Sequence, residues 1–319
     1  MLIAGFCNPL LDISAHVQAD LLQKYSLKPN DAILASPQHA GLLPDLPQPQ
    51  TFSAGGAGQN TMRAVQHLLP AGSTKFFGCV GRDEHGRILG EQARKDGLEP
   101  CYQVKEGEAT GTCICLLSPG CRSLVATLGA ANHFDHAQFD AERDLQGVQL
   151  IYITGFFCTV SPQTIDKIIE FKKNDSSVIL AMNLSAPFIS EYYADVQARL
   201  VEAADYVFGN ETEARAYAQK HQLPGESTLS FAQAIAKKYP KKIVVFTQGS
   251  EETIIVRDGF TLTVPVTLVE NVVDTNGAGD CFVGGFLAGL AQSLSLQECA
   301  TMGHALAAKI ITRIGIYFD

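Results

Sequence analysis

The chain has 319 residues, of which 46% are hydrophobic, and its formal net charge is −9. A chain of this size can bury a large core, and its acidic balance opposes nucleic acid or an anionic membrane as a main partner, since both need a basic protein face. The first residues carry no basic leader and no apolar stretch is long enough to span a membrane, so we expect a cytoplasmic protein, with the nucleus as an open alternative.

Two early stretches consist of short strand-like runs and turn residues. They hold apolar runs at 32–35, 112–117 and 123–128, and a turn at 118–120 separates the last two. This pattern predicts antiparallel strands inserted into a larger unit, where a small β-sheet would serve as a lid. We therefore divide one unit, 1–319, into a lid of 15–55 and 99–129 and a core of 1–14, 56–98 and 130–319.

The later part of the chain alternates apolar runs with helical patterns. The runs at 150–153, 178–182 and 243–246 predict buried strands, and 206–208 is a weaker example. Ser161 followed by Pro162 is typical of a helix start. Such alternation indicates an α/β fold with a mainly parallel sheet covered on both faces. A polar or glycine-containing segment follows each run, and we expect these segments to line one crevice at the carboxyl ends of the strands.

The nine cysteines are scattered, odd in number and without a C-x-x-C pair. Their spacing indicates neither a disulfide framework nor a zinc site. Cys113 and Cys115 would point to the same side of a strand, which is compatible with a redox pair. We prefer the interpretation that they are buried as small hydrophobic residues.

The most informative segment runs from Asp274 to Asp280, with the sequence DTNGAGD. Gly277 and Gly279 allow backbone conformations in which the N–H groups of Gly277, Ala278 and Gly279 converge on an anion. An apolar helical pattern follows, so the dipole of a helix N-terminus adds to this attraction. Asp280 on the first turn is then placed to act as a general base in phosphoryl transfer. The plainer alternative is an ordinary turn in which Asp280 is a cap.

With its following helix, this segment resembles the C-terminal signature of the ribokinase-like (PfkB) carbohydrate and nucleoside kinases. Further segments resemble the adenosine kinases within that family, namely 8–14, 24–31, 110–113, 183–190 and 208–214. The resemblance covers nearly the whole chain, and it is consistent with the absence of a Walker loop. It implies a ribokinase-like three-layer α/β/α core with a small β-sheet lid, ATP and Mg²⁺ as cofactors, adenosine and ATP as ligands, and a monomer.

The same resemblance assigns residues to a nucleoside site. Asp12 would accept hydrogen bonds from the ribose 2′- and 3′-hydroxyls, because its carboxylate has two oxygens. Phe157 would stack on adenine, although packing in the core is the alternative for Phe157 and for Phe188. The other residues assigned to the sugar and base are Asn8, Leu10, Gly55, Gly56, Asn60, Cys113, Leu124 and Phe188.

A second group is assigned to the phosphates, the metal ion and ATP. Arg122 would reach over the transferring phosphates, although an exposed surface arginine is the alternative. Asn210 would bind on the nucleotide side and Glu213 would place Mg²⁺ through water; the same pair also reads as a helix capping box. The residues assigned near ATP are Thr247, Gln248, Gly249, Asn276 and His304, although a lone histidine in the helical segment 298–310 is commonly a packing residue.

One departure and three rival functions accompany this interpretation. Relatives usually place small hydroxyl residues after the glycine pair, whereas this chain has Ala57 and Gly58. The first rival is another PfkB kinase acting on guanosine, inosine, ribose or fructose. The second is a non-catalytic nucleoside-binding protein, which an intact Asp280 opposes. A dinucleotide oxidoreductase is opposed by the lack of an early G-x-G-x-x-G.

Overall fold

The computed structural model describes residues 1–29, 32–118 and 121–318. They form a large sheet of nine strands and a smaller sheet of five strands, with the order β14-β13-β12-β11-β10-β9-β1-β5-β6 in the large sheet. Its parallel strands are β1 (Leu2–Phe6), β5 (Thr74–Gly81), β6 (Glu99–Lys105), β9 (Val148–Thr154), β10 (Ile179–Asn183), β11 (Tyr206–Asn210) and β12 (Ile243–Gln248). Two antiparallel strands complete one edge, β13 (Glu251–Arg257) and β14 (Phe260–Val264).

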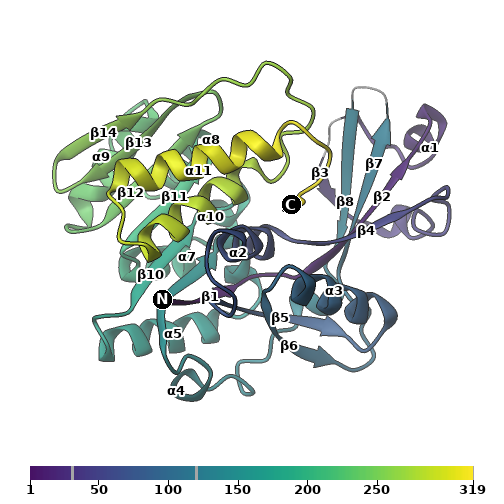
Figure 1. Cartoon of the computed structure of the whole chain (residues 1–319), viewed down its shortest axis with the longest axis horizontal. Helices are drawn as coiled ribbons and strands as arrows, with labels where there is room; N and C mark the ends of the chain where they lie inside the picture. Colours follow the sequence, from purple (N-terminus) through teal and green to yellow (C-terminus); the bar gives the residue numbers. More distant parts are fainter. Residues whose placement is uncertain (30–31, 119–120, 319) are drawn as a thin grey trace.

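Helices cover both faces of the large sheet, which gives the three-layer arrangement seen in Figure 1. One layer contains α2 (Ala57–Leu68), α3 (Glu84–Lys95), α10 (Ala278–Ala291) and α11 (Leu296–Ile310). The opposite layer contains α5 (Pro162–Asn174), α7 (Ala194–Ala203), α8 (Glu211–Lys220) and α9 (Thr228–Lys238). Three short helices lie outside these layers or at their ends, namely α1 (Ala19–Lys24), α4 (Ala141–Asp144) and α6 (Pro187–Tyr192). The predicted α/β class and helix positions are confirmed.

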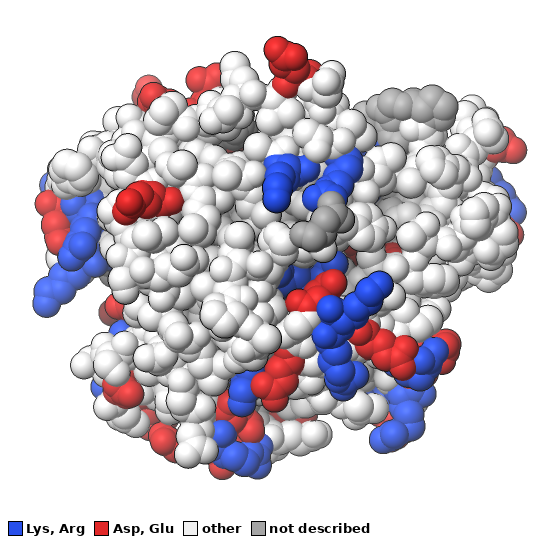
Figure 2. Space-filling model, viewed as in Figure 1, with Lys and Arg blue, Asp and Glu red and all other residues white. Residues whose placement is uncertain are grey.

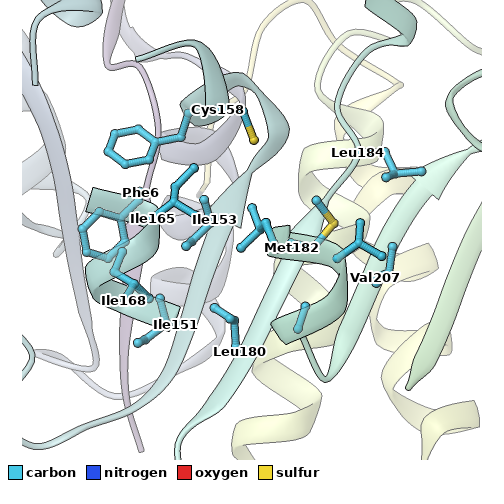
Figure 3. Packing of buried hydrophobic residues seen from close by; sticks show 14 of the residues in the cluster. Phe6, Ile151, Ile153, Cys158, Ile165, Ile168, Leu180, Met182, Leu184 and Val207 are labelled. Carbon is cyan, nitrogen blue, oxygen red and sulfur yellow. The ribbon is translucent and has the colours of Figure 1, made fainter. Parts of the chain in front are cut away.

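Strand β9 shows why its apolar run is continuous. Ile151 and Ile153 face the layer that contains Ile165 and Ile168 of α5, whereas Leu150 and Tyr152 face the α2–α10 layer. Successive side chains of a strand point to opposite faces, so apolar side chains occupy successive positions in a strand that is buried on both faces. Figure 3 shows the α5 side of this packing.

The smaller sheet has the strand order β3-β8-β7-β2-β4. Its strands are β2 (Leu10–His16), β3 (Ala32–Leu34), β4 (Thr51–Gly55), β7 (Thr112–Ser118) and β8 (Cys121–Thr127). The expectation of an antiparallel sheet is only partly correct, because β2 pairs with β7 and β3 with β8 in parallel. The sheet also begins at Leu10 rather than residue 15, and 99–105 pairs in the large sheet as β6. Two residues of the predicted turn, 119–120, lie outside the described residues.

Charged side chains of both signs lie on the surface of the molecule (Figure 2). On the face shown in Figure 2, Lys and Arg side chains are interspersed with Asp and Glu side chains. None of the described helices combines the length and the apolar character needed to cross a bilayer.

Candidate active site

Strands β9 to β12 end at one cavity of about 100 Å³. These strands are neighbours and parallel, so their carboxyl ends meet at the same edge of the sheet. The predicted crevice is thereby confirmed. The residues that line it are Ala57, Tyr152, Thr154, Phe156, Asn183, Ser185, Phe208, Gly209, Asn210, Glu213, Val245, Thr247, Gly279, Asp280, Phe282 and Val283.

The start of α10 presents backbone donors at this cavity. Gly277 is the residue before the helix and has a left-handed φ of 75°. The Ala278 N–H donates to the Thr275 carbonyl at 3.2 Å, whereas the N–H groups of Gly277 and Gly279 donate to no other described residue. Two donors without a described partner, at the positive end of a helix dipole, are suited to bind an anion.

Asp280, on the first turn of α10, is partly enclosed beside these donors. Its Oδ2 accepts a hydrogen bond from Asn60 Nδ2 at 3.1 Å. Loss of solvation raises the pKa of Asp280 to about 7, against the opposing effect of the Asn60 hydrogen bond. A carboxylate with a pKa near neutrality is suited to accept a proton in catalysis. Asn60, expected in the sugar site, therefore also contacts the candidate base.

Helix α2, which carries Asn60, begins at a second glycine turn. Gly56 has a φ of 90°, and a Cβ there would lie 2.3 Å from the carbonyl oxygen of Asn8. A Cβ at Gly58 already meets Cys7 Cβ at 2.3 Å. The close packing of α2 on the end of β1 thus leaves no room for a hydroxyl-bearing side chain at position 58. This accounts for one of the two positions, 57 and 58, at which the chain lacks the small hydroxyl residues expected from its relatives.

A buried arginine that the sequence did not single out connects this region to the end of the chain. Arg63 Nη1 donates to the Ala54 carbonyl at 2.6 Å, and Nη2 donates to the Ile316 carbonyl at 3.1 Å. Its Nε pairs with Asp96 at 2.5 Å. Ile316 in turn packs on Gly277, where a Cβ would lie 2.1 Å from Ile316 Cδ1. The C-terminal segment, seen in Figure 1 between α11 and the small sheet, therefore supports the glycine turn.

Asn210 and Glu213 form the expected capping box at the start of α8. Asn210 Oδ1 accepts from the Glu213 N–H at 2.9 Å, and the Glu213 oxygens accept from Asn210 N at 3.1 Å and Nδ2 at 2.8 Å. Burial raises the pKa of Glu213 to about 7. Two carboxyl groups with raised pKa values, Glu213 and Asp280, therefore line the same cavity.

The residues expected around a sugar and base gather where β1 meets the small sheet. Asp12 and Cys113 are register partners in β2 and β7, and a Cβ at Gly55 would lie 2.2 Å from Asp12 Oδ1. Burial raises the pKa of Asp12 well above its usual value. Asn8 Nδ2 donates to the Ala131 carbonyl at 3.4 Å, and no described residue donates to the buried Asn8 Oδ1. Leu10, Cys113 and Leu124 share one apolar cluster.

The two aromatic residues expected at a base differ in burial. Phe157 is fully buried, and its ring centroid lies 5.4 Å from that of Phe134 and 5.8 Å from that of Phe6. Its neighbour Phe156 lines the cavity instead and lies 6.2 Å from Phe188, which is exposed. Phe157 therefore packs in the core in this structure, as its alternative interpretation predicts. The stacking of Phe157 on adenine stays a prediction.

Arg122 is directed at Asp274. The two side chains form a largely buried ion pair, and Arg122 Nη2 also contacts Cys115 Sγ at 3.3 Å. Asp274 Oδ1 accepts from the backbone and side-chain nitrogens of Asn276 at 3.0 and 2.8 Å. The pair therefore joins β8 of the small sheet to the glycine turn, and Arg122 does not line the cavity.

The residues expected near ATP do not all line the cavity. Thr247 lines the cavity, whereas Gln248 and Gly249 belong to the hairpin between β12 and β13, where Gln248 Nε2 donates to the Glu252 carbonyl. His304 lies within hydrogen-bond distance of Thr253 Oγ1, 2.8 Å, and packs on Phe282 at 5.1 Å between ring centroids. His304 thus has a packing role in this structure, as its alternative interpretation predicts.

Comparison with known proteins places the chain in a family. The model of the pfkB family carbohydrate kinases matches residues 19–319. Adenosine kinase from Saccharomyces cerevisiae is 42% identical, over 97% of this chain and 94% of that protein. Adenosine kinase 2 from Arabidopsis thaliana is 38% identical, over 98% of this chain and 94% of that protein.

Solved structures agree over the same length. Adenosine kinase from Anopheles gambiae, in complex with P1,P4-di(adenosine-5) tetraphosphate, has a TM-score of 0.88 and 39% identity, covering 98% of this chain and 96% of that one. Apo adenosine kinase from Trypanosoma brucei brucei has a TM-score of 0.93 and 30% identity, covering 98% and 99%. This chain therefore belongs to the pfkB family of carbohydrate kinases.

Proposed function

We propose that the chain is an enzyme of purine salvage that phosphorylates the 5′-hydroxyl of adenosine with ATP, giving AMP and ADP. The observation that carries this proposal is the position of Asp280 beside two free backbone donors at the start of α10. The relatives named adenosine kinase align with nearly the whole chain, which supports adenosine as the acceptor.

Asp280 would remove the proton of the 5′-hydroxyl as its oxygen attacks the γ-phosphorus of ATP. The bond between the γ-phosphorus and the bridging oxygen then breaks, and ADP leaves. The N–H groups of Gly277 and Gly279 would stabilise the negative charge on the transferring phosphoryl group, because donors fixed in advance need no reorganisation. The Ala278 N–H joins them only if it gives up its bond to Thr275.

The nucleoside would lie against the small sheet. Asp12 offers two oxygens to the ribose hydroxyls, and the unpaired Asn8 Oδ1 is a further acceptor for a hydroxyl donor. The apolar cluster of Leu10, Cys113 and Leu124 suits a base better than a bare sugar. Arg122 would have to leave Asp274 to contact the phosphates.

The cavity also fits a magnesium ion, which would neutralise charge on the ATP phosphates. Asn210, Glu213 and Asp280 contribute oxygens, the ligand atoms that Mg²⁺ prefers. Both Glu213 oxygens already accept hydrogen bonds from Asn210. Glu213 is therefore expected to act on the ion through water.

The test is ADP release with Mg-ATP, offering adenosine, inosine, guanosine, ribose and fructose in parallel. Rapid turnover with adenosine alone supports the proposal. Faster turnover with another acceptor would keep the chemistry of Asp280 and overturn the substrate. Adenosine binding without turnover would favour a non-catalytic nucleoside-binding protein.

We further expect a monomer in the cytoplasm. Light scattering during size-exclusion chromatography tests the first statement, and a doubled mass would contradict it. Imaging of the tagged chain in cells tests the second.

A further inference from the structure

Three side chains that are far apart in the sequence meet on the small sheet. Cys113 and Cys115 lie two residues apart in β7, and Asp12 is the register partner of Cys113 in the neighbouring β2. One carboxylate oxygen and the two sulfur atoms all lie within 4.8 Å of one another. The spacing of cysteines alone did not indicate this cluster, because its third member is an aspartate about 100 residues away.

The chemistry of these donors selects a particular kind of cation. Zinc is bound by cysteine sulfur and carboxylate oxygen, and a tetrahedral site with three protein ligands keeps one open position. Its ligand atoms would be roughly 3.5–3.8 Å apart, so a small side-chain adjustment from the observed cluster suffices. Magnesium and calcium prefer oxygen ligands, so the two sulfur atoms favour a thiophilic ion.

The surroundings reduce the charge of such a site. Two thiolates and one carboxylate carry three negative charges, of which a divalent cation would neutralise two, and the Arg122 guanidinium, which also pairs with Asp274, lies beside them. Arg122 Nη2 contacts Cys115 Sγ at 3.3 Å and is thus placed as an outer partner of one ligand. Cys115 is fully buried, whereas Asp12 is only partly buried.

We propose that Asp12, Cys113 and Cys115 form a site for Zn²⁺ or another thiophilic divalent cation, and that the bound ion excludes the nucleoside. The exclusion follows because the ion would occupy the Asp12 oxygens that are assigned to the ribose hydroxyls. This second half rests on the proposed function, whereas binding of the ion does not.

Binding is tested with Cd²⁺ on the reduced full-length chain, using the ultraviolet absorption of thiolate-to-cadmium charge transfer and calorimetry. One equivalent of Cd²⁺ with this band is expected in the wild type and in Cys101→Ser, whose half-buried cysteine lies outside the cluster. The band should be lost in Cys113→Ser and in Cys115→Ser, and Cys115→Ala serves as a second variant if serine impairs folding. Asp12→Asn should weaken binding. A band of unchanged intensity in both Cys113→Ser and Cys115→Ser would overturn the site.

Exclusion is tested by adding Zn²⁺ to the adenosine phosphorylation assay at fixed Mg-ATP. Inhibition by Zn²⁺ should decrease as the adenosine concentration increases. The ratio of the activity with Zn²⁺ to the activity without Zn²⁺ should rise toward one in Cys115→Ser but not in Cys101→Ser. Cadmium binding without zinc inhibition would overturn the exclusion and keep the site. Lack of turnover before any metal is added would count against the proposed function, and the cadmium titration would still decide the site.

Discussion

The two glycine turns that open α2 and α10 share a positive φ but differ in ψ, which is 134° at Gly56 and 0° at Gly277, and in their surroundings. Gly56 and Gly277 both precede the first helical residue, with φ of 90° and 75°. Gly56 packs on the backbone of Asn8, whereas Gly277 packs on the Ile316 side chain. One turn begins the helix that carries Asn60, and the other begins the helix that carries Asp280, where we propose that an anion binds. Their helices meet through the Asn60–Asp280 hydrogen bond.

The largest effect is expected when the carboxylate of the second turn is removed. Asp280→Asn should lower kcat by about 10²–10⁴-fold, because a positioned base contributes that much, while the Kd for adenosine changes little. Single-turnover kinetics and nucleoside titration measure the two quantities. Near-normal turnover would contradict the role of Asp280.

The same variant also tests the pKa of the carboxyl group. In the folded chain the pKa of Asp280 is raised to about 7, so the folded state binds the proton of this carboxyl group more tightly than the unfolded state does. The resulting contribution to the free energy of unfolding is lost as the pH rises from the pKa of Asp280 in the unfolded chain through about 7. Asp280→Asn should therefore exceed the wild type in unfolding free energy above pH 7, by on the order of 1–3 kcal/mol. Urea unfolding at pH 5 and pH 8 measures this, and equal differences at both values would contradict it.

Replacing each glycine in turn distinguishes the proposed roles of the two turns. Gly277→Ala should displace the free donors through its clash with Ile316 and lower kcat by about 10²–10³-fold. Gly56→Ala should instead raise KM for adenosine and lower stability by about 1–3 kcal/mol, through strain and its clash with Asn8. Gly107→Ala is the matched control, because its φ is 78° and a Cβ there meets nothing within 4 Å. A loss of kcat in Gly56→Ala alone would reverse the assignment of the turns.

Removing the contact between the helices should have a smaller effect. Asn60→Ala deletes a hydrogen bond that lowers the pKa of Asp280, so that pKa should rise. The acid limb of kcat/KM against pH should move to higher pH by about one unit, since a hydrogen bond to a charged group contributes roughly 1.5–3 kcal/mol. An unchanged midpoint would show that Asn60 acts only on the sugar.

The smallest expected effect concerns Glu213, which lines the same cavity as Asp280. Glu213→Gln retains a side chain that can complete the capping box and should raise the Mg²⁺ concentration for half-maximal activity by about 10-fold. Saturating Mg²⁺ should restore most of kcat. Glu211→Gln, on the same first turn of α8, is the matched control because Glu211 is exposed and does not line the cavity. Equal behaviour of the two variants would exclude a metal role for Glu213.

The sequence by itself determined the α/β class, the principal strands and the helix that begins at 278. Local reasons were sufficient there, since apolar runs mark strands buried on both faces and glycine marks a left-handed backbone. It also indicated the crevice, because parallel strands must end at one edge. The Asn210–Glu213 capping box is likewise encoded by four adjacent residues.

Tertiary structure alone decided which distant side chains meet. The Asn60–Asp280 contact spans 220 positions, Arg63 reaches Ile316 across 253 positions, and Arg122 pairs with Asp274 across 152. The periodic pattern of apolar residues in the sequence does not indicate such long-range pairs. For the same reason the sequence did not show that Phe157 is fully buried while Phe156 lines the cavity, and it did not join Asp12 to Cys113 and Cys115. Those juxtapositions depend on strand order and helix packing, which join segments that are distant in the sequence.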